Sequence, residues 1–129
     1  MLCNSPEKAA DYWRLHIEGH PLFDAQRECF VVLLLSTKLE RGGHHFVSVG
    51  ALNESMAHPR EVFRVAVIAA AYAVLFLHNH PSGEPEPSQA DLASTKRLVE
   101  SANVLGIRVM DHVIVGHQRH CSLREMGLI

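Results

Sequence analysis

The segment that most limits how this chain can fold is residues 29–35, where seven apolar side chains follow one another without a polar break. A strand with one face in water alternates apolar and polar residues. A continuous apolar run rich in branched side chains is typical of a strand buried on both faces. Residues 73–77 form a second run of this kind. The two runs predict strands in the interior of a sheet that is covered on both sides.

A helix and a hairpin are predicted around the first of these strands. Ser5 is a good N-cap and Pro6 suits the first helical position, while Gly19 is a stop signal, so a helix is expected between them. In "KLERGGHHFVSVG" the Gly-Gly pair predicts the turn of a hairpin. The residues that follow the glycines predict its second strand.

Two further helices and a final strand are predicted in the second half of the chain. "HPREVFRVAVIAAA" predicts a helix that begins near Pro59, with Phe63 and Val67 among the residues that face the core. Residues 88–106 carry apolar side chains at helical spacing and end on a glycine, which is typical of a helix with a C-terminal cap. Residues 107–116 read as another interior strand.

The alternation of strand, helix and strand predicts an α/β fold with a mixed β-sheet flanked by helices. The sheet is expected to be mixed because its first two strands form a hairpin. The length suits a single domain over residues 1–129, in which residues 1–20 hold the N-terminal helix and residues 21–129 form the core. In such sheets, ligands bind beyond the ends of the strands.

Composition narrows the classes of protein to consider. The net charge of −2 gives no support to broad electrostatic binding of nucleic acid. The three cysteines, Cys3, Cys29 and Cys121, have no paired spacing, which favours a reducing cytoplasm over a disulfide framework. No signal peptide is visible, and the longest apolar run is too short to span a bilayer, so no membrane association is expected. Ten histidines direct attention to metal or acid–base chemistry.

The stretch "LFLHNHPSGEPEPSQAD" carries the strongest chemical signal. His78 and His80 are two residues apart at the end of a predicted strand, so their side chains point to the same side. Asp91 follows at the start of the next helix, within reach if the intervening loop folds back. Two imidazoles and a carboxylate leave a fourth tetrahedral position for water, the arrangement of a catalytic zinc site. The same ligands suit other divalent ions, so zinc is a preference.

A second interpretation of the same residues needs no metal. Ser88-x-x-Asp91 fits a capping box at the start of an apolar helix. Histidines at strand ends are also common as polar terminators. The two interpretations are compatible for Ser88, because its hydroxyl can cap the helix and still face the site.

The pattern H-x-H, seven residues and then S-x-x-D resembles the signature of JAMM-motif metalloproteases and isopeptidases. His78, His80, Ser88 and Asp91 match it. The strings "HPREVFR", "HNHPSGEPEPSQAD" and "DHVIVG" resemble the RadC-like branch of the JAB/MPN (JAMM-motif) domain family, whose architecture is cytidine-deaminase-like. The likeness begins near residue 23. Many RadC-like chains carry a helix-hairpin-helix region in front that this sequence lacks, so the resemblance implies either the catalytic-type domain alone or a short-form protein.

The resemblance also implies roles for individual residues. His78, His80 and Asp91 would bind Zn²⁺, and Ser88 would help to hold the tetrahedral intermediate. A glutamate from an early strand would act as general base on the bound water. Glu28, just before the first interior strand, suits this part, with Glu54 and Glu61 as rivals.

Two features set limits on this resemblance. The characterised isopeptidases have Ser or Thr between the two histidines, whereas this chain has Asn79, which leaves the substrate open. The RadC-like branch carries a DNA-repair label that nothing in this sequence supports independently. His112 and Asp111 lie on the last interior strand, where they could orient a metal-binding imidazole, although a buried, hydrogen-bonded histidine explains His112 equally well.

The sequence therefore predicts a zinc-dependent hydrolase of a peptide or isopeptide bond, with Glu28 as base and Ser88 as a donor to the oxyanion. Two alternatives from other classes stay open. One is a nucleic-acid-linked module whose binding would depend steeply on salt. The other is a catalytically silent scaffold of the same fold.

Overall fold

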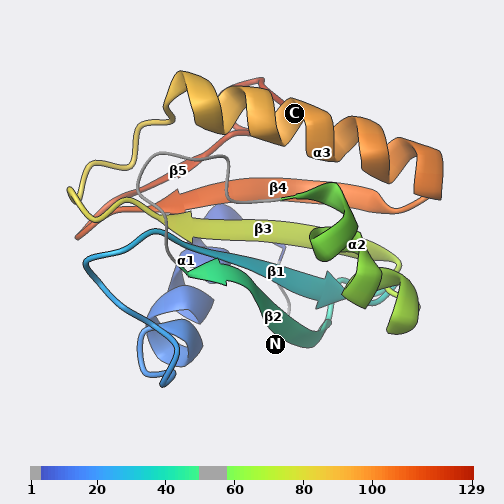
Figure 1. Ribbon diagram of the computed structural model, residues 1–129, viewed down its shortest axis with the longest axis horizontal. Helices are drawn as coiled ribbons and strands as arrows, with labels where there is room; N and C mark the ends of the chain where they lie inside the picture. The colour runs from blue at the N-terminus through green and yellow to red at the C-terminus, as the bar shows by residue number, and fades with distance from the viewer. Residues whose placement is uncertain (1–3, 50–57) are drawn as a thin grey trace.

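The computed structural model describes residues 4–49 and 58–129, which form three layers with the sheet in the middle (Figure 1). The described sheet has five strands in the order β2-β1-β3-β4-β5. In chain order the elements are α1 (Pro6–Tyr12), the π-helix η1 (Trp13–Ile17), β1 (Cys29–Leu35), β2 (Arg41–Val49), α2 (Pro59–Ile68), β3 (Ala73–Asn79), α3 (Gln89–Leu105), β4 (Arg108–Val115) and β5 (His120–Ser122).

The interior strands β1 and β3 confirm the prediction drawn from the apolar runs. All seven residues of each strand are buried. β1 pairs antiparallel with both β2 and β3, whereas β3 and β4 are parallel neighbours. The sheet is thus mixed, as predicted, and α3 is the crossover that parallel neighbours require.

Alternate residues of the interior strands face two separate apolar layers. One layer contains Leu75 and Leu77 of β3 and packs against Trp13 and the rest of the N-terminal helix. The other contains Val74 and Phe76 and packs against α2 and α3. Because side chains alternate along a strand, the first layer receives odd-numbered residues of β3 and the second receives even-numbered ones.

The hairpin of β1 and β2 forms as predicted, but its turn is not the Gly-Gly pair. The turn lies before the glycines, where the N–H of Ser36 donates to the carbonyl of Glu40 at 2.9 Å. Gly42 and Gly43 lie inside β2, at a shift in register opposite Leu34. Gly43 has φ of 120°, which a side chain would disfavour. The glycines therefore form a bulge, which suits them as well as a turn does.

The helix α2 begins at Pro59 as predicted, but the expected core position of Val67 is wrong. Val67 is 57% exposed, and the buried residues are Val62, Phe63 and Ala66. Val67 directly follows the buried Ala66, so its side chain points about a quarter-turn further around the helix, away from the face that covers the sheet.

The N-terminal and crossover helices begin and end where their caps predict, with one difference. Ser5 accepts a hydrogen bond from the N–H of Lys8, and Gly106 closes α3 in the left-handed conformation with φ of 72°. The N-terminal helix changes to π-helical form at Trp13 and stops at Ile17. Among the described residues, no helix combines the length and the hydropathy that crossing a membrane requires.

The packing of α3 on the sheet gives a first test. Leu98 is fully buried between α3 and the sheet, whereas Val104 on the same helix is 87% exposed. Leu98→Ala is expected to lower the free energy of unfolding by about 2–5 kcal/mol because it leaves a cavity. Val104→Ala is the matched control and should change it by less than about 0.5 kcal/mol. Chemical denaturation of both variants measures the difference, and equal effects would contradict this packing.

Candidate metal centre

The candidate centre lies where β3 ends and α3 begins. Residues His78 and Asn79 are the last of β3, and His80 follows directly. The loop that follows turns back so that Asp91, in the first turn of α3, faces the two histidines. His78 is 3% exposed, and the side chains of His80 and Asp91 are 13% and 14% exposed.

The donor atoms of these three residues converge on one point. The Nε2 atoms of His78 and His80 are 3.2 Å apart. An oxygen of Asp91 lies 3.3 Å from Nε2 of His78, and its other oxygen lies 2.9 Å from Nε2 of His80. Donors bound tetrahedrally to zinc at 2.0–2.1 Å are about 3.3 Å from one another. The three side chains thus have the spacing of one face of a tetrahedral site, and they are the described residues that could hold a metal ion.

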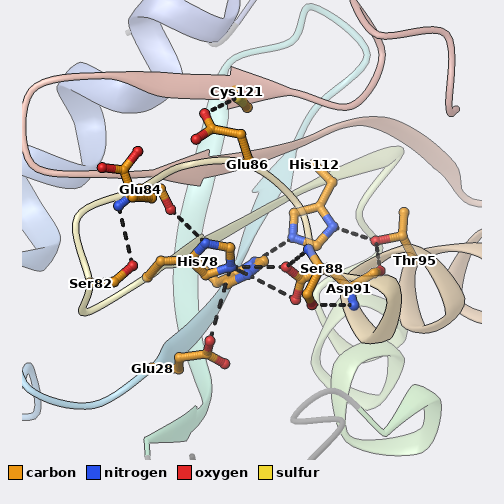
Figure 2. A network of polar contacts seen from close by, with 11 residues as sticks. Glu28, His78, Ser82, Glu84, Glu86, Ser88, Asp91, Thr95, His112 and Cys121 are labelled. Atoms are coloured by element: carbon orange, nitrogen blue, oxygen red, sulfur yellow. Dashed lines mark hydrogen bonds and ion pairs between the residues drawn. The ribbon is translucent and has the colours of Figure 1, made fainter.

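A chain of buried hydrogen bonds fixes which nitrogen of His78 is free to bind (Figure 2). The hydroxyl of Thr95 donates to the carbonyl of Asp91 at 2.8 Å, so towards His112 its oxygen must accept. Nδ1 of His112 is therefore the donor in the 2.6 Å contact with Thr95. A neutral His112 then accepts at Nε2 from Nδ1–H of His78, also at 2.6 Å. His78 is left with a lone pair on Nε2, the atom that faces the site.

Burial keeps His112 neutral in this chain. The ring is 1% exposed, and its burial, together with the nearby His78, holds the pKa of His112 well below its usual range. A charged His112 would donate from both nitrogens and could not accept from His78. Neutrality of His112 is therefore a condition for the metal-binding tautomer of His78.

His80 is oriented by the loop instead. Its Nδ1 contacts the carbonyl of Glu84 at 2.8 Å, so a hydrogen on Nδ1 leaves Nε2 to face the site. The loop is itself held against the turn between β4 and β5, because Arg119 pairs with Glu84 at 2.8 Å. Gly83 and Gly116 are in close contact there, since a Cβ on Gly116 would lie 2.3 Å from the carbonyl oxygen of Gly83. The second ligand is thus positioned by loop packing.

Asp91 serves the helix and the centre at once. The N–H of Ser88 donates to a carboxylate oxygen of Asp91 at 2.9 Å, and the N–H of Asp91 donates to the hydroxyl of Ser88 at 3.0 Å. This is the predicted capping box. Burial acts to raise the pKa of Asp91. In the metal-free protein, hydrogen bonds from His78 and His80, when these rings also carry a hydrogen on Nε2, act with the N–H of Ser88 to outweigh burial and hold that pKa well below its usual range. A metal ion would take the place of those Nε2 hydrogens. Asp91 is therefore an ionised ligand near neutral pH.

Glu28 is the described candidate for the base that the fold brings to the centre. β1 pairs with β3 so that Phe30 lies opposite His78, which places Glu28 opposite His80. Its carboxylate lies 4.0 Å from Nε2 of His80, and its side chain is 23% exposed. Burial raises the pKa of Glu28, although the nearby histidines act against this shift. These features suit a proton acceptor beside a metal, and the role itself stays a prediction.

The rival glutamates lie elsewhere or outside the described residues. Glu61 is in the first turn of α2 and pairs with Arg64 at 3.6 Å. Glu54 falls in residues 50–57, outside the described part of the chain. Ser88 is exposed at the mouth of the centre. Its oxygen accepts the N–H of Asp91, and no described residue accepts its own hydrogen, which is therefore available to a bound substrate.

Of the two residues suggested as supports for a ligand, the structure brings only one to the centre. His112 contacts His78, as described above. Asp111 points to the opposite face of β4, where it accepts from the hydroxyl of Ser122 at 2.5 Å and the N–H of Arg124 at 3.0 Å. Thr95 was not among the predicted site residues. Its position four residues after Asp91, on the same face of α3, is the signal that could have identified it.

Comparisons with known proteins identify the family that the chain resembles. A family model described as a RadC-like JAB domain matches residues 3–128. Similar curated proteins include the UPF0758 proteins of Pelobacter propionicus, 47% identical over 97% of this chain, and of Bacillus cereus, 45% identical over 97%. Another, from Desulforamulus reducens, is 46% identical over 84% of this chain. These matches cover 52%, 53% and 48% of the respective relatives, so the chain spans about half their length.

The hydrogen-bond chain gives the second test. Thr95→Val keeps the shape of the side chain but removes the acceptor for His112, so His78 is no longer held in its metal-binding tautomer. The affinity for Zn²⁺, measured by competition with a chromophoric chelator, should fall about 10- to 100-fold. Thr95→Ser keeps the hydroxyl and is the matched control, with an expected change of less than about threefold. Equal affinities for the two variants would show that the chain does not position His78.

Proposed function

The chain belongs to the RadC-like JAB domain family, and on that premise we propose that it is a zinc-dependent hydrolase of peptide or isopeptide bonds. The observation that carries the proposal is the convergence of His78, His80 and Asp91 with a fourth group, Glu28, 4.0 Å from His80. A site that served only to stabilise the fold would need no partly buried carboxylate beside an open coordination position. Each of these groups is held by its own hydrogen bonds or strand pairing.

Zinc is the proposed ion because of the donor set. Two imidazole nitrogens and one carboxylate oxygen are the ligands of several catalytic zinc sites, in which the fourth position stays open. When bound, the ion would lower the pKa of a water molecule and polarise the carbonyl of the substrate. Both second nitrogens of the histidines are already engaged, at His112 and at the carbonyl of Glu84, as metal-binding histidines usually require.

The protein residues supply the proton transfers and the orientation. Glu28 accepts the proton of the attacking water and later returns it to the leaving amine. Its raised pKa, caused by burial, brings its proton affinity closer to that of the groups with which it exchanges the proton. Ser88 donates its free hydroxyl hydrogen to the oxyanion that develops on the carbonyl oxygen.

The proposed setting is the cytoplasm, and the proposed partner is a peptide or isopeptide substrate. Cys29 and Cys121, the cysteines within the described residues, are both free, which is usual in a reducing compartment. Asn79 stands between the two metal ligands, where the isopeptidases that this chain resembles have Ser or Thr, so ubiquitin-type conjugates are not assumed as substrates.

The third test measures the zinc content of the protein and the effect of replacing the proposed base, Glu28. Protein purified without a histidine tag should contain one zinc ion per chain by mass spectrometry of metals. Glu28→Gln should keep that zinc but lower the cleavage of a peptide library, followed by mass spectrometry, at least about 100-fold. The matched control is Glu61→Gln, which makes the same change at the rival glutamate in α2 and should leave both metal content and cleavage unchanged.

Other outcomes distinguish the competing functions. Full cleavage by Glu28→Gln would remove Glu28 from the mechanism, and loss with Glu61→Gln would transfer the role. Bound zinc with no cleavage of the library by the wild type would favour the silent scaffold. Salt-sensitive binding of duplex or single-stranded DNA by a protein that takes up no zinc would favour the nucleic-acid-linked module.

A further inference from the structure

The side chain of Asn79 contacts the backbone on both sides of Glu28. Its Oδ1 accepts from the N–H of Cys29 at 2.8 Å, and its Nδ2 donates to the carbonyl of Arg27 at 3.1 Å. These two groups belong to the two peptide bonds that flank Glu28. An N–H can only donate and a carbonyl can only accept, so both contacts together fix the orientation of the amide.

The amide replaces the backbone pairing at the point where the ladder between β1 and β3 stops. The paired residues of the two strands end with Phe30 opposite His78. The next N–H along β1 on this edge, that of Cys29, bonds to the side chain of Asn79 instead of a backbone carbonyl. Within the described part of the chain, the other polar contact between Glu28 and this end of the β3 segment is the 4.0 Å approach of its carboxylate to His80.

Asn79 acts from the face of the sheet opposite the metal centre. Odd-numbered residues of β3, such as Leu77, face the N-terminal helix, whereas His78 and His80 face α3. Asn79 is 7% exposed, so its amide is in a buried environment where an unpaired partner is costly. It therefore reaches Glu28 through the backbone and does not contact the ligand atoms that face the site.

We propose that Asn79 is the positioning residue that fixes Glu28 relative to the two metal-binding histidines. Asn79 lies between the two histidines in the sequence, and its side chain is hydrogen-bonded to the peptide groups on both sides of Glu28. The metal ligands and the base are thereby held in a fixed relative position. The proposal rests on the proposed function, because it assigns to Asn79 the placement of the base in that reaction. It also explains why an amide, with a donor and an acceptor, stands at this position. A hydroxyl is too short to reach both partners, and a carboxylate cannot donate to Arg27.

The first part of the test needs neither metal nor substrate. In metal-free protein, amide hydrogen exchange of Cys29, followed by NMR, should become at least about tenfold faster in Asn79→Ala. Asn79→Asp keeps an acceptor for Cys29, so this amide should stay protected, and the isosteric variant covers the case in which Asn79→Ala does not fold. Asn103→Ala, at an exposed asparagine of α3, is the matched control and should leave exchange at Cys29 unchanged. An unchanged Cys29 amide in a folded Asn79→Ala overturns the proposal.

The second part distinguishes positioning from a general structural role. Asn79→Ala and Asn79→Asp should each lower turnover of the peptide library at least about tenfold, because small displacements of a catalytic group have large effects on rate. The affinity for Zn²⁺ should stay within about threefold of the wild type. In the Glu28→Gln background the same two changes should cause no further loss, since Asn79 acts only through Glu28.

The possible failures are separable. An equal loss of turnover in both backgrounds, or full turnover in both Asn79 variants, overturns the role of Asn79 while leaving the hydrolase proposal intact. A wild-type protein that binds zinc but shows no turnover overturns the proposed function. In that case the rate of hydrogen exchange at the Cys29 amide in Asn79→Ala is sufficient to show whether Asn79 holds the segment that carries Glu28.

Discussion

The parallel pairing of β3 with β4 is the constraint on which the candidate centre depends. Parallel neighbours cannot be joined by a tight turn, so the chain must leave the end of β3, cross the sheet as α3 and return to the start of β4. This crossover brings the first turn of α3 back to the end of β3 (Figure 1). Asp91 then faces His78 and His80, and Thr95, one turn later, faces His112 on β4. The same backbone arrangement supplies a ligand and the support for another ligand.

The centre is ordered by hydrogen bonds that have a direction. The carbonyl of Asp91 inside α3 can only accept, and this determines in turn the roles of Thr95, His112 and His78. The helix backbone thereby selects the tautomer of a residue on another element. The members of this hydrogen-bond chain are neutral, whereas the side chain of Asp91 next to it carries a negative charge. Such a buried network is stable only when each member has its partner, which is the case for this chain of four residues.

Much of the fold could be predicted from the sequence because its signals are local. Uninterrupted apolar runs identified β1 and β3, and Ser5, Ser88 and Gly106 marked the ends of helices. The expected turn at Gly42 and Gly43 was wrong, because a glycine pair suits a bulge as well as a turn and the sequence does not contain the pairing register. The core position expected for Val67 was wrong because helical spacing does not show which face of the helix is turned towards the sheet, and that face carries Val62, Phe63 and Ala66.

Some residues of the candidate site could likewise be grouped from the sequence, whereas others are brought together only by the fold. His78, His80 and Asp91 could be grouped from their spacing along one strand, loop and helix. Glu28 could not, because it is about fifty residues away in the sequence and meets the histidines only through the register of β1 on β3. Thr95 and His112 could not be joined either, since their contact depends on how α3 lies across β4. Local chemistry is visible in a sequence, whereas contacts between strands and across layers require the fold.

The double use of Asp91 affects how sequences of this family can be interpreted. Ser88 and Asp91 form a capping box, and the loss of such a cap destabilises a protein by about 1 kcal/mol. A descendant that no longer bound metal would still be under selection to keep both residues for the sake of α3. Their presence therefore reports helix stability as much as chemistry. Glu28 lies before β1 and has no comparable role in a helix cap, so under the proposed function a change at that position would be the more informative sign that the base had been lost.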